Sequence, residues 1–317
     1  MKEHDLIIIG GGISAMTAAL MAAKNKINNI LIIDREETLG GILNQCINNG
    51  YGFKLLNTEL TGPEYVNIIS EKLKEYPNID VKLNTEVVKV QNKNVVKYIN
   101  SSEGVVYISS KAIIIATGCR EKFSGNTSVP LSKYSGIYTV GSVQRIVNTE
   151  GYLPGKEPII IVDNNWALQV AKRILIEGAK IKGILLSSNF IPDDRVMKIL
   201  KEFKVPIIKN SKVKDLIGQY KIEGIKIFNE ETKQTSYIGC DSLIMSVGYF
   251  PEINIVKDLQ MEIDKETFAP VVNNYATSID GIFACGNVIY GLNAINENNL
   301  DGLEAGKVAA EYIKSKF

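Results

Sequence analysis

The hydrophobic pattern of residues 1–41 predicts a strand, a glycine turn, a helix and a second strand. Residues 5–9 form a short apolar run rich in β-branched isoleucine, which is typical of a central parallel strand. The run leads into residues 10–15, Gly-Gly-Gly-Ile-Ser-Ala, which match the pattern G-x-G-x-x-A, and an alanine-rich segment of helical period extends to about Lys24. A second apolar run, 29–33, ends at Asp34. This order is that of the first βαβ unit of a dinucleotide-binding domain.

Each part of this unit has a physical role in holding a dinucleotide. Gly10 makes the tight turn, Gly12 leaves room for a pyrophosphate against the backbone, and Ala15 lets helix and strand pack closely. The helix start offers N–H groups and the positive end of the helix dipole to phosphates, and Asp34 can accept hydrogen bonds from both ribose hydroxyls. The candidate contacts here are Gly10, Gly12, Ile13, Ser14, Ala15 and Asp34. Two alternatives are a glycine turn of a generic α/β domain and a signal peptide, against which the triple glycine argues.

The rest of the pattern repeats this layout. After a helix from about 62 to 76, alternating segments at 81–83, 86–90, 95–99 and 105–108 predict a β-meander, and 111–118 a buried strand ending in a small-residue turn. A loop-rich stretch with a short helix near 142–148 precedes a second strand, helix and strand at 159–162, 166–177 and 181–186. A helix (191–203), short strands (207–209, 213–216 and 225–228) and a buried strand (242–247) follow, and the chain ends with a strand within 277–287 and a helix at 299–313.

This duplication predicts an α/β fold of two Rossmann-like, three-layer ββα dinucleotide-binding domains, the second inserted in the first. The first expected domain comprises residues 1–118 and 245–317, and the second, inserted domain comprises 119–244.

Composition and charge exclude several classes of protein. With 45% hydrophobic and 22% charged residues, the 317-residue chain is of the soluble globular type. A net charge of +1 gives no electrostatic footprint for nucleic acid or an anionic membrane, and no membrane span is expected. The four cysteines lie far apart, which argues against a redox disulfide or a metal site and fits the cytoplasm. His4 is the only histidine, which argues against histidine-based acid–base catalysis.

The motifs at both ends of the chain resemble one flavoprotein superfamily. The glycine turn with Asp34, the Ala116-Thr117-Gly118 turn, and Gly-Ile-Phe-Ala-Cys-Gly-Asn at 281–287 are similar to the pyridine nucleotide–disulfide oxidoreductases of thioredoxin-reductase size. The resemblance implies FAD on the first and last of these segments, with Gly286 and Asn287 near its sugar–phosphate chain. It therefore makes residues 1–118 with 245–317 the expected FAD-binding domain and 119–244 the expected NAD(P)-binding-like domain. Further candidate cofactor contacts are Arg35, Gly40, Gly41, Ile42, Gln45, Val88, Ala116, Thr117 and Gly118.

Residues 40–52 together with 61–65 resemble a bacterial branch of FAD/NAD(P)-dependent oxidoreductases that lacks a redox disulfide. Members of that branch often accompany a glycerol-3-phosphate-dehydrogenase-like flavoprotein and a small cysteine-rich protein. The branch usually has C-I-H-N-G, whereas this chain has Asn48 in place of the histidine, which argues against proton transfer there. Cys46 is the candidate catalytic residue, either as a charge-transfer or electron-relay thiol or, more simply, as a packed thiol lining the site.

The second nucleotide motif departs from the pattern. Residues 163–168, Asp-Asn-Asn-Trp-Ala-Leu, stand where G-x-G-x-x-G/A is expected. Asn165 places a side chain where backbone should meet pyrophosphate, and a carboxylate from Asp163 ~4 Å from a phosphate charge would cost roughly 4 kcal/mol at an effective dielectric of ~20, or about a thousandfold in affinity. NAD(P)H binding is therefore doubtful, although asparagine tolerates positive φ and an atypical nicotinamide site stays open.

These observations predict an FAD-dependent oxidoreductase that works as an electron-transferring subunit. Its expected partner is another redox protein, a companion flavoprotein dehydrogenase or a ferredoxin-like donor, within a homodimer or hetero-oligomer. The alternatives are an NAD(P)H-dependent flavin oxidoreductase with an atypical site and a non-catalytic FAD-holding scaffold for a partner dehydrogenase. Thioredoxin reductase itself is disfavoured because that chemistry needs two cysteines at short spacing.

Overall fold

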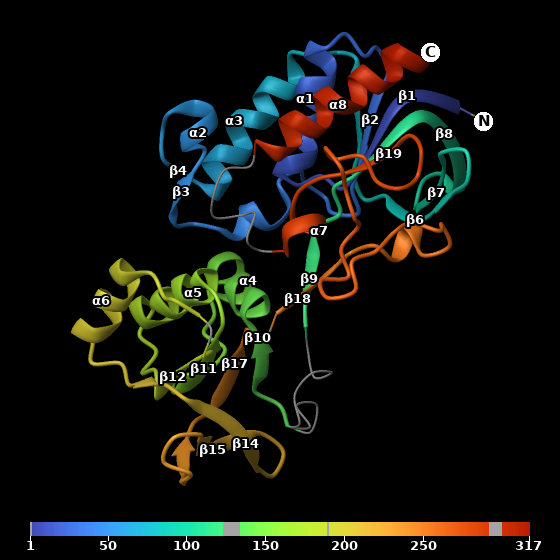
Figure 1. Cartoon of the computed structure of the whole chain (residues 1–317). Coiled ribbons are helices and arrows are strands. Elements are labelled where there is room, and N and C mark those ends of the chain that lie inside the picture. Colours follow the sequence, from blue (N-terminus) through green and yellow to red (C-terminus); the bar gives the residue numbers. More distant parts are fainter. Residues whose placement is uncertain (1, 123–133, 189, 247, 292–299) are drawn as a thin grey trace. The chain divides into compact units, whose positions relative to one another are not determined.

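The computed structural model describes residues 2–122, 134–188, 190–246, 248–291 and 300–317. The chain divides into two compact units (Figure 1), Met1–Arg120 with Phe250–Phe317, and Glu121–Tyr249. No helix in these ranges is long and apolar enough to cross a membrane.

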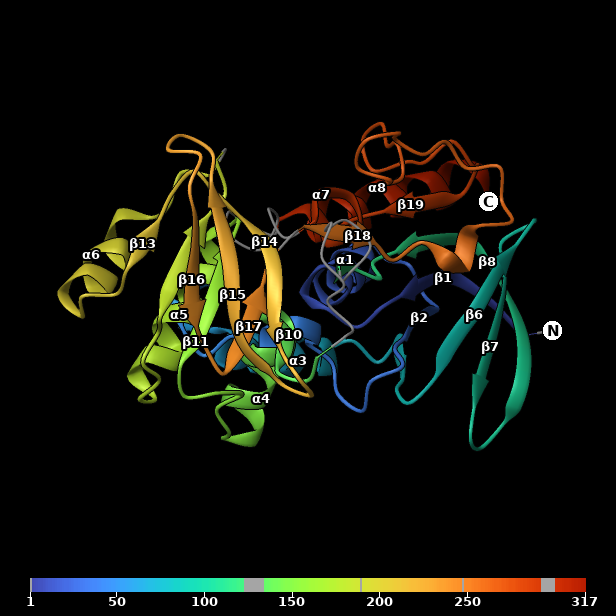
Figure 2. The same cartoon turned by 90° about the horizontal axis from the view of Figure 1, so that it is seen from below.

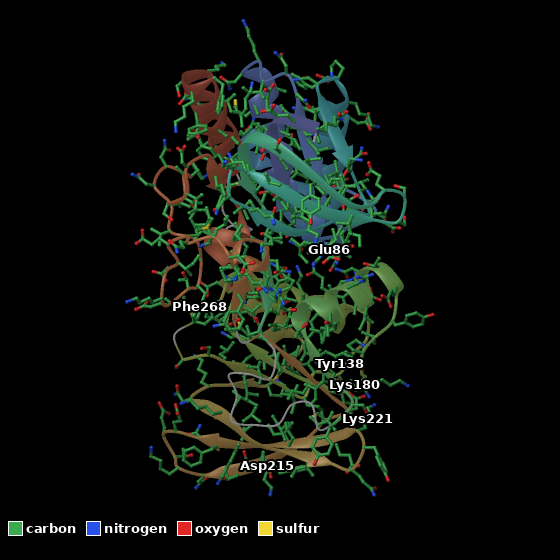
Figure 3. All side chains as sticks on the ribbon, turned by 90° about the vertical axis from the view of Figure 1, so that its right-hand side faces the viewer. Glu86, Tyr138, Lys180, Asp215, Lys221 and Phe268 are labelled. Carbon is green, nitrogen blue, oxygen red and sulfur yellow. The ribbon has the colours of Figure 1, made fainter. Side chains whose placement is uncertain are left out.

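The first unit is built on a parallel sheet whose carboxyl ends carry the glycine motifs. Its strands are β1 (Lys2–Ile9), β2 (Ile30–Ile33), β5 (Ile79–Lys82), β8 (Gly104–Ile115) and β19 (Ile282–Ala284), in the order β5-β2-β1-β8-β19. The first half of β8 also pairs antiparallel with β7 (Val95–Asn100), which pairs with β6 (Glu86–Gln91). Figure 3 labels Glu86, the first residue of β6.

Two sequence predictions in this region are wrong. Residues 105–108 and 111–118 are not separate strands, because β8 runs without a break from the meander into the parallel sheet. The segment predicted at 81–83 is not part of the meander, because β5 pairs parallel with β2 after a helical crossover. Alternation over three residues does not reveal which neighbour a strand pairs with.

The first unit has three layers. One face of the parallel sheet, including Ile7, Leu31 and Ile113, packs into a core with Tyr98 of the meander and Met261. The alternate residues face the helices α1 (Ile13–Lys24), α3 (Gly62–Lys74) and α8 (Asp301–Lys316), and α1 packs against both of the others. The smaller elements are η1 (Gly41–Gln45), β3 (Asn49–Tyr51), α2 (Phe53–Leu56), β4 (Leu60–Thr61), η3 (Asn254–Val256) and α7 (Asn287–Tyr290).

The first turn of α3 follows from its sequence. Thr61 is the N-cap, its hydroxyl accepts the Glu64 N–H, and the Glu64 carboxylate accepts the Thr61 N–H at 2.9 Å. This capping box, with Pro63 next to it, fixes the start of the helix at the predicted turn.

The second unit repeats this order. Its parallel strands are β10 (Ile137–Thr139), β17 (Ser242–Met245), β11 (Pro158–Val162), β12 (Gly183–Leu186) and β13 (Ile207–Ile208), adjacent in that order, and its helices are α4 (Val140–Glu150), α5 (Asn165–Ile176) and α6 (Asp194–Glu202). The meander is β14 (Ser211–Gly218), β15 (Ile222–Asn229) and β16 (Thr235–Gly239), visible together in Figure 2. The sequence missed β16 because its residues are mostly exposed and polar, and it placed β13 in the meander although β13 pairs parallel with β12. The short strands β9 (Cys119–Glu121) and β18 (Tyr249–Pro251) pair where the chain crosses between the units.

Candidate dinucleotide site

The glycine turn after β1 can be built only with glycine at its first position. Gly10 has φ +108°, and a Cβ there would overlap the Ala116 oxygen and lie 2.8 Å from the Ala116 carbonyl carbon. A Cβ on Gly12, in contrast, would meet no atom within 4 Å. Gly12 is also the N-cap of α1 and carries no side-chain cap. The space beside Gly12 is therefore open, and no side chain competes with a phosphate group for the start of α1.

The Gly40-Gly41 loop packs directly on this turn. The Gly40 N–H donates to the Gly11 oxygen at 2.8 Å, and a Cβ on Gly41 would lie 3.3 Å from the Gly12 Cα. These two glycines therefore let the loop lie directly against the glycine turn. The Asp34 carboxylate accepts the Gly11 N–H through Oδ2 and the Glu36 N–H at 2.8 Å through Oδ1.

Two other predicted cofactor contacts, Arg35 and Val88, have exposed side chains. Arg35 is exposed, with Nε 3.5 Å from Glu36 Oε1. Val88 is 48% exposed on β6, whereas the residue that follows β5 and donates its N–H to the Asp34 oxygen is Thr85, at 2.9 Å. The structure does not bring Val88 to the glycine turn, and its contact with a cofactor stays a prediction.

The ends of β8 and β19 lie at the same carboxyl edge of the sheet as the glycine turn. The Thr117 hydroxyl donates to the Glu252 oxygen at 2.6 Å, and Gly118 has φ +74°. After β19, a Cβ on Gly286 would lie 2.7 Å from Ser14 Oγ, so Gly286 packs against the first turn of α1. Asn287 follows as the first residue of α7. Ligands of open parallel sheets bind at this edge.

Asp301, the first residue of α8, is a site residue that the sequence did not reveal. Its Oδ2 accepts the Gly286 N–H at 2.5 Å, and its Oδ1 lies 3.5 Å from the Ser14 hydroxyl that donates to it. Burial raises the pKa of Asp301, while hydrogen bonds from Gly286 and other donors oppose that shift. The signal that could have located it is the spacing of Gly302 and Gly306, which bring α8 against α1.

Cys46 lies just after η1, which contains the candidate contacts Ile42 and Gln45. Its side chain has 0% exposure, and its thiol donates to the Ile42 oxygen at 3.4 Å. Burial raises the pKa of Tyr51, and hydrogen bonding to the Cys46 thiol adds to this shift. Cys46 therefore has local polar partners, and its role as an electron relay stays a prediction. None of the four cysteines forms a disulfide.

The corresponding turn of the second unit is filled by its own side chains. Asn164 caps α5, its Oδ1 accepting the Ala167 N–H at 2.9 Å. Its Nδ2 lies 2.6 Å from Asp163 Oδ1, 2.9 Å from Ser246 Oγ and 3.1 Å from the Tyr249 hydroxyl, and the Ser246 hydroxyl donates to Asp163 Oδ1 at 2.5 Å. We call Asp163, Asn164, Ser246 and Tyr249 the Asn164 network.

The residues around the Asn164 network add a second carboxylate and a large ring. Glu121 accepts the Gly141 N–H at 2.9 Å, and burial raises the pKa of Glu121. Trp166 is buried with its ring centroid 6.2 Å from that of Tyr249. Asn165 accepts the Asp193 N–H at 2.7 Å. A side chain thus caps the start of α5, in contrast to the start of α1, where none does.

This fold and site define an oxidoreductase built from two dinucleotide-binding-type units. A family model described as pyridine nucleotide-disulphide oxidoreductase matches residues 4–309. A 34.2 kDa protein in the rubredoxin operon of Clostridium pasteurianum is 27% identical over 327 aligned positions, covering 99% of either chain. The ferredoxin–NADP reductase of Picrophilus torridus is 25% identical, with 91% of this chain and 86% of that protein covered.

Solved structures of similar fold include the bacillithiol disulfide reductase Bdr of Bacillus cereus, with TM-score 0.80, 18% identity and 100% of both chains covered. Thioredoxin reductase of Lactococcus lactis has TM-score 0.78 and 21% identity, with 98% of this chain and 99% of that chain covered. The chain belongs to the pyridine nucleotide-disulphide oxidoreductase family and is an FAD-dependent oxidoreductase. The predicted fold class and the predicted family resemblance are confirmed.

Proposed function

We propose that the protein is an electron-transferring flavoprotein that exchanges electrons with a partner redox protein rather than with NAD(P)H. The observation that carries this proposal is the contrast between the two helix starts. At α1 no side chain caps the helix and the space beside Gly12 is open, whereas at α5 Asn164 caps the helix and hydrogen-bonds to the neighbouring Asp163 carboxylate. A dinucleotide diphosphate fits the first and is repelled by the second.

In this proposal FAD binds to the first unit, and the second unit retains the fold without the nucleotide. FAD supplies the capacity to take up and release electrons. The first turn of α1, with Gly12 and Ser14, binds the diphosphate, Asp34 accepts the adenosine ribose hydroxyls, and the turn at Gly286 and Asn287 lies against the sugar–phosphate chain. The η1 loop borders the flavin ring.

The choice of partner rests on two observations. No two of the four cysteines stand at short spacing in the sequence, so the closely spaced redox pair of thioredoxin reductases has no counterpart here. One relative is a protein of a rubredoxin operon, and another is named as a ferredoxin–NADP reductase. A small iron–sulfur protein or a companion flavoprotein dehydrogenase as the redox partner is consistent with both observations. Thiols without disulfides also support placing the protein in the cytoplasm.

The test is an anaerobic titration of the purified yellow protein with NADH and with NADPH, followed by the absorbance of oxidised flavin. We expect no bleaching within minutes by either nicotinamide and full bleaching by dithionite or by a reduced ferredoxin or rubredoxin. Bleaching within seconds by NADH or NADPH would refute the proposal and favour a flavin reductase with an atypical nicotinamide site. A flavin that dithionite reduces but no redox protein reduces would favour the scaffold.

The matched variant is Asp163→Gly combined with Asn165→Gly, which removes the carboxylate and restores glycine at the position nearest the pyrophosphate. If the Asn164 network excludes the nucleotide, this variant should bind NADH at least tenfold more tightly than the unaltered protein does. Lys172→Gly/Glu177→Gly, later in the same segment, serves as the control for a double glycine substitution.

A further inference from the structure

Asp301 is held at a fixed place in the cofactor crevice by the packing of α8 on α1. A Cβ on Gly302 would overlap the Ser14 oxygen and lie 2.9 Å from the Ser14 carbonyl carbon, and a Cβ on Gly306 would lie 2.9 Å from the carbonyl carbon of Ala18. Both contacts are to backbone, so no rotation of a side chain can relieve them. The two helices therefore approach as closely as their backbones allow, which leaves Asp301 next to Ser14.

The Asp301 carboxyl group joins two segments that the proposed function assigns to FAD. Oδ2 accepts the Gly286 N–H at 2.5 Å, and Oδ1 accepts from the Ser14 hydroxyl at 3.5 Å. The three residues come from α8, the turn after β19 and the first turn of α1. While Asp301 is ionised, the Ser14 hydroxyl proton points to the carboxylate and cannot be donated to a phosphate.

No cation balances this carboxylate in the part of the chain that the structure describes, where none of the ion pairs includes Asp301. The titratable groups coupled to it are Tyr65 of α3, Cys285 at the end of β19, and Tyr275 and Tyr290, with Glu304 near Tyr275. All of them are neutral or acidic at neutral pH. For Tyr65, burial and then the charge of Asp301 raise the pKa to about 12.

We propose that Asp301 is a positioning residue of the flavin site and that FAD binding is coupled to uptake of one proton by its carboxylate. The proposal rests on the assignment of FAD to the first unit. The proton comes from solvent and binds to Oδ1, since Oδ2 accepts from Gly286. The hydrogen bond then reverses: the carboxyl O–H donates to Ser14 Oγ, and the Ser14 hydroxyl is free to donate to the anionic diphosphate. When FAD leaves, the proton returns to solvent. Burial, which raises the pKa of Asp301, favours this uptake of a proton.

The test measures FAD release from the holoprotein by dilution, through the fluorescence of free flavin, from pH 5 to pH 8. We expect the dissociation constant of the unaltered protein to rise by about tenfold over this range, because the ionised Asp301 carboxylate keeps the Ser14 hydroxyl from donating to the diphosphate. Asp301→Asn imitates the protonated acid, since its amide oxygen accepts from Gly286 and its amide nitrogen donates to Ser14. At every pH, Asp301→Asn should bind FAD with the affinity that the unaltered protein shows at pH 5. The control is Asp280→Asn, which alters an exposed carboxylate before β19 that pairs with Lys316 of α8. This variant should show the same dependence of the dissociation constant on pH as the unaltered protein.

The outcomes separate this inference from the alternatives. A merely structural role for Asp301 would weaken FAD binding in Asp301→Asn equally at all pH values and leave the slope unchanged, which would overturn the proposal. A dissociation constant of the unaltered protein that does not change with pH would also overturn the proposal, and this measurement does not depend on the folding of any variant. Ser14→Ala, which removes the relay, should bind FAD more weakly at pH 5 and lose the slope, and a slope retained there would contradict the proposed reversal. A protein isolated without FAD would instead refute the proposed function.

Discussion

The close approach of α1 and α8 should make Gly302 one of the most sensitive positions in the first unit. Gly302→Ala adds one carbon that would overlap the Ser14 oxygen and Thr17 Oγ1 and lie 2.9 Å from the Ser14 carbonyl carbon, where real Cβ atoms stay beyond 3.0 Å. The Thr17 hydroxyl can rotate, but the Ser14 backbone cannot yield without moving the first turn of α1. Overpacking of this kind costs about 1–3 kcal/mol, whereas replacing glycine by alanine in a helix returns up to about 1 kcal/mol. Because the contact is with backbone, we expect the upper part of that range and a net loss of about 1–2 kcal/mol.

The assay is urea unfolding of the holoprotein, followed by circular dichroism and by release of FAD. Lys307→Ala, an exposed change on the same helix, is the control and should alter stability by less than ~0.5 kcal/mol. Gly302→Ala should also release FAD at a lower urea concentration than the control does, because Ser14 and Asp301 move together. The reasoning would be refuted if Gly302→Ala were as stable as the control and retained FAD equally well.

Three further predictions follow from the same geometry. Gly10→Ala should abolish FAD retention while leaving the second unit folded, because alanine at φ +108° would overlap the Ala116 oxygen. Flavin absorbance of the protein peak in gel filtration measures FAD retention, and the emission of Trp166, the only tryptophan, reports the folding of the second unit. In the native protein the fully buried Cys46 should resist Ellman's reagent, and only the partly exposed Cys119 should react quickly. Mass spectrometry of the labelled peptides identifies which cysteine has reacted. Burial lowers the pKa of His4, so the unfolded chain takes up a proton first and stability should fall as the pH drops below about 6.5; the loss should be absent in His4→Gln.

The hydrophobic pattern determined most of the element order because each half of the chain alternates apolar strands with a helix of one clear period. The bounds of α1, residues 13–24, are those that the sequence predicts. The errors concern pairing: β5 and β13 are short strands whose neighbours depend on the crossover helices, and β8 joins two segments that the pattern separates. Pairing is a contact between distant residues, which a local period does not contain.

In the candidate site, too, local features could be predicted from the sequence and contacts between distant residues could not. Gly10, Gly12 and Asp34 could be recognised from spacing because one local turn fixes their geometry. The departure of the second motif was also visible at residues 163–168, but the side chains that fill this turn were not, since Ser246 and Tyr249 come from more than eighty residues away.

The sequence by itself determined that this chain contains two related domains and that only the first has the glycines a dinucleotide requires. The tertiary structure decided which side chains occupy the second turn and that Asp301, almost three hundred residues from Ser14, lies within hydrogen-bond distance of it. The physical reason is that a glycine turn is a local property of the backbone, whereas a buried carboxylate acquires its partners and its pKa only when helices pack.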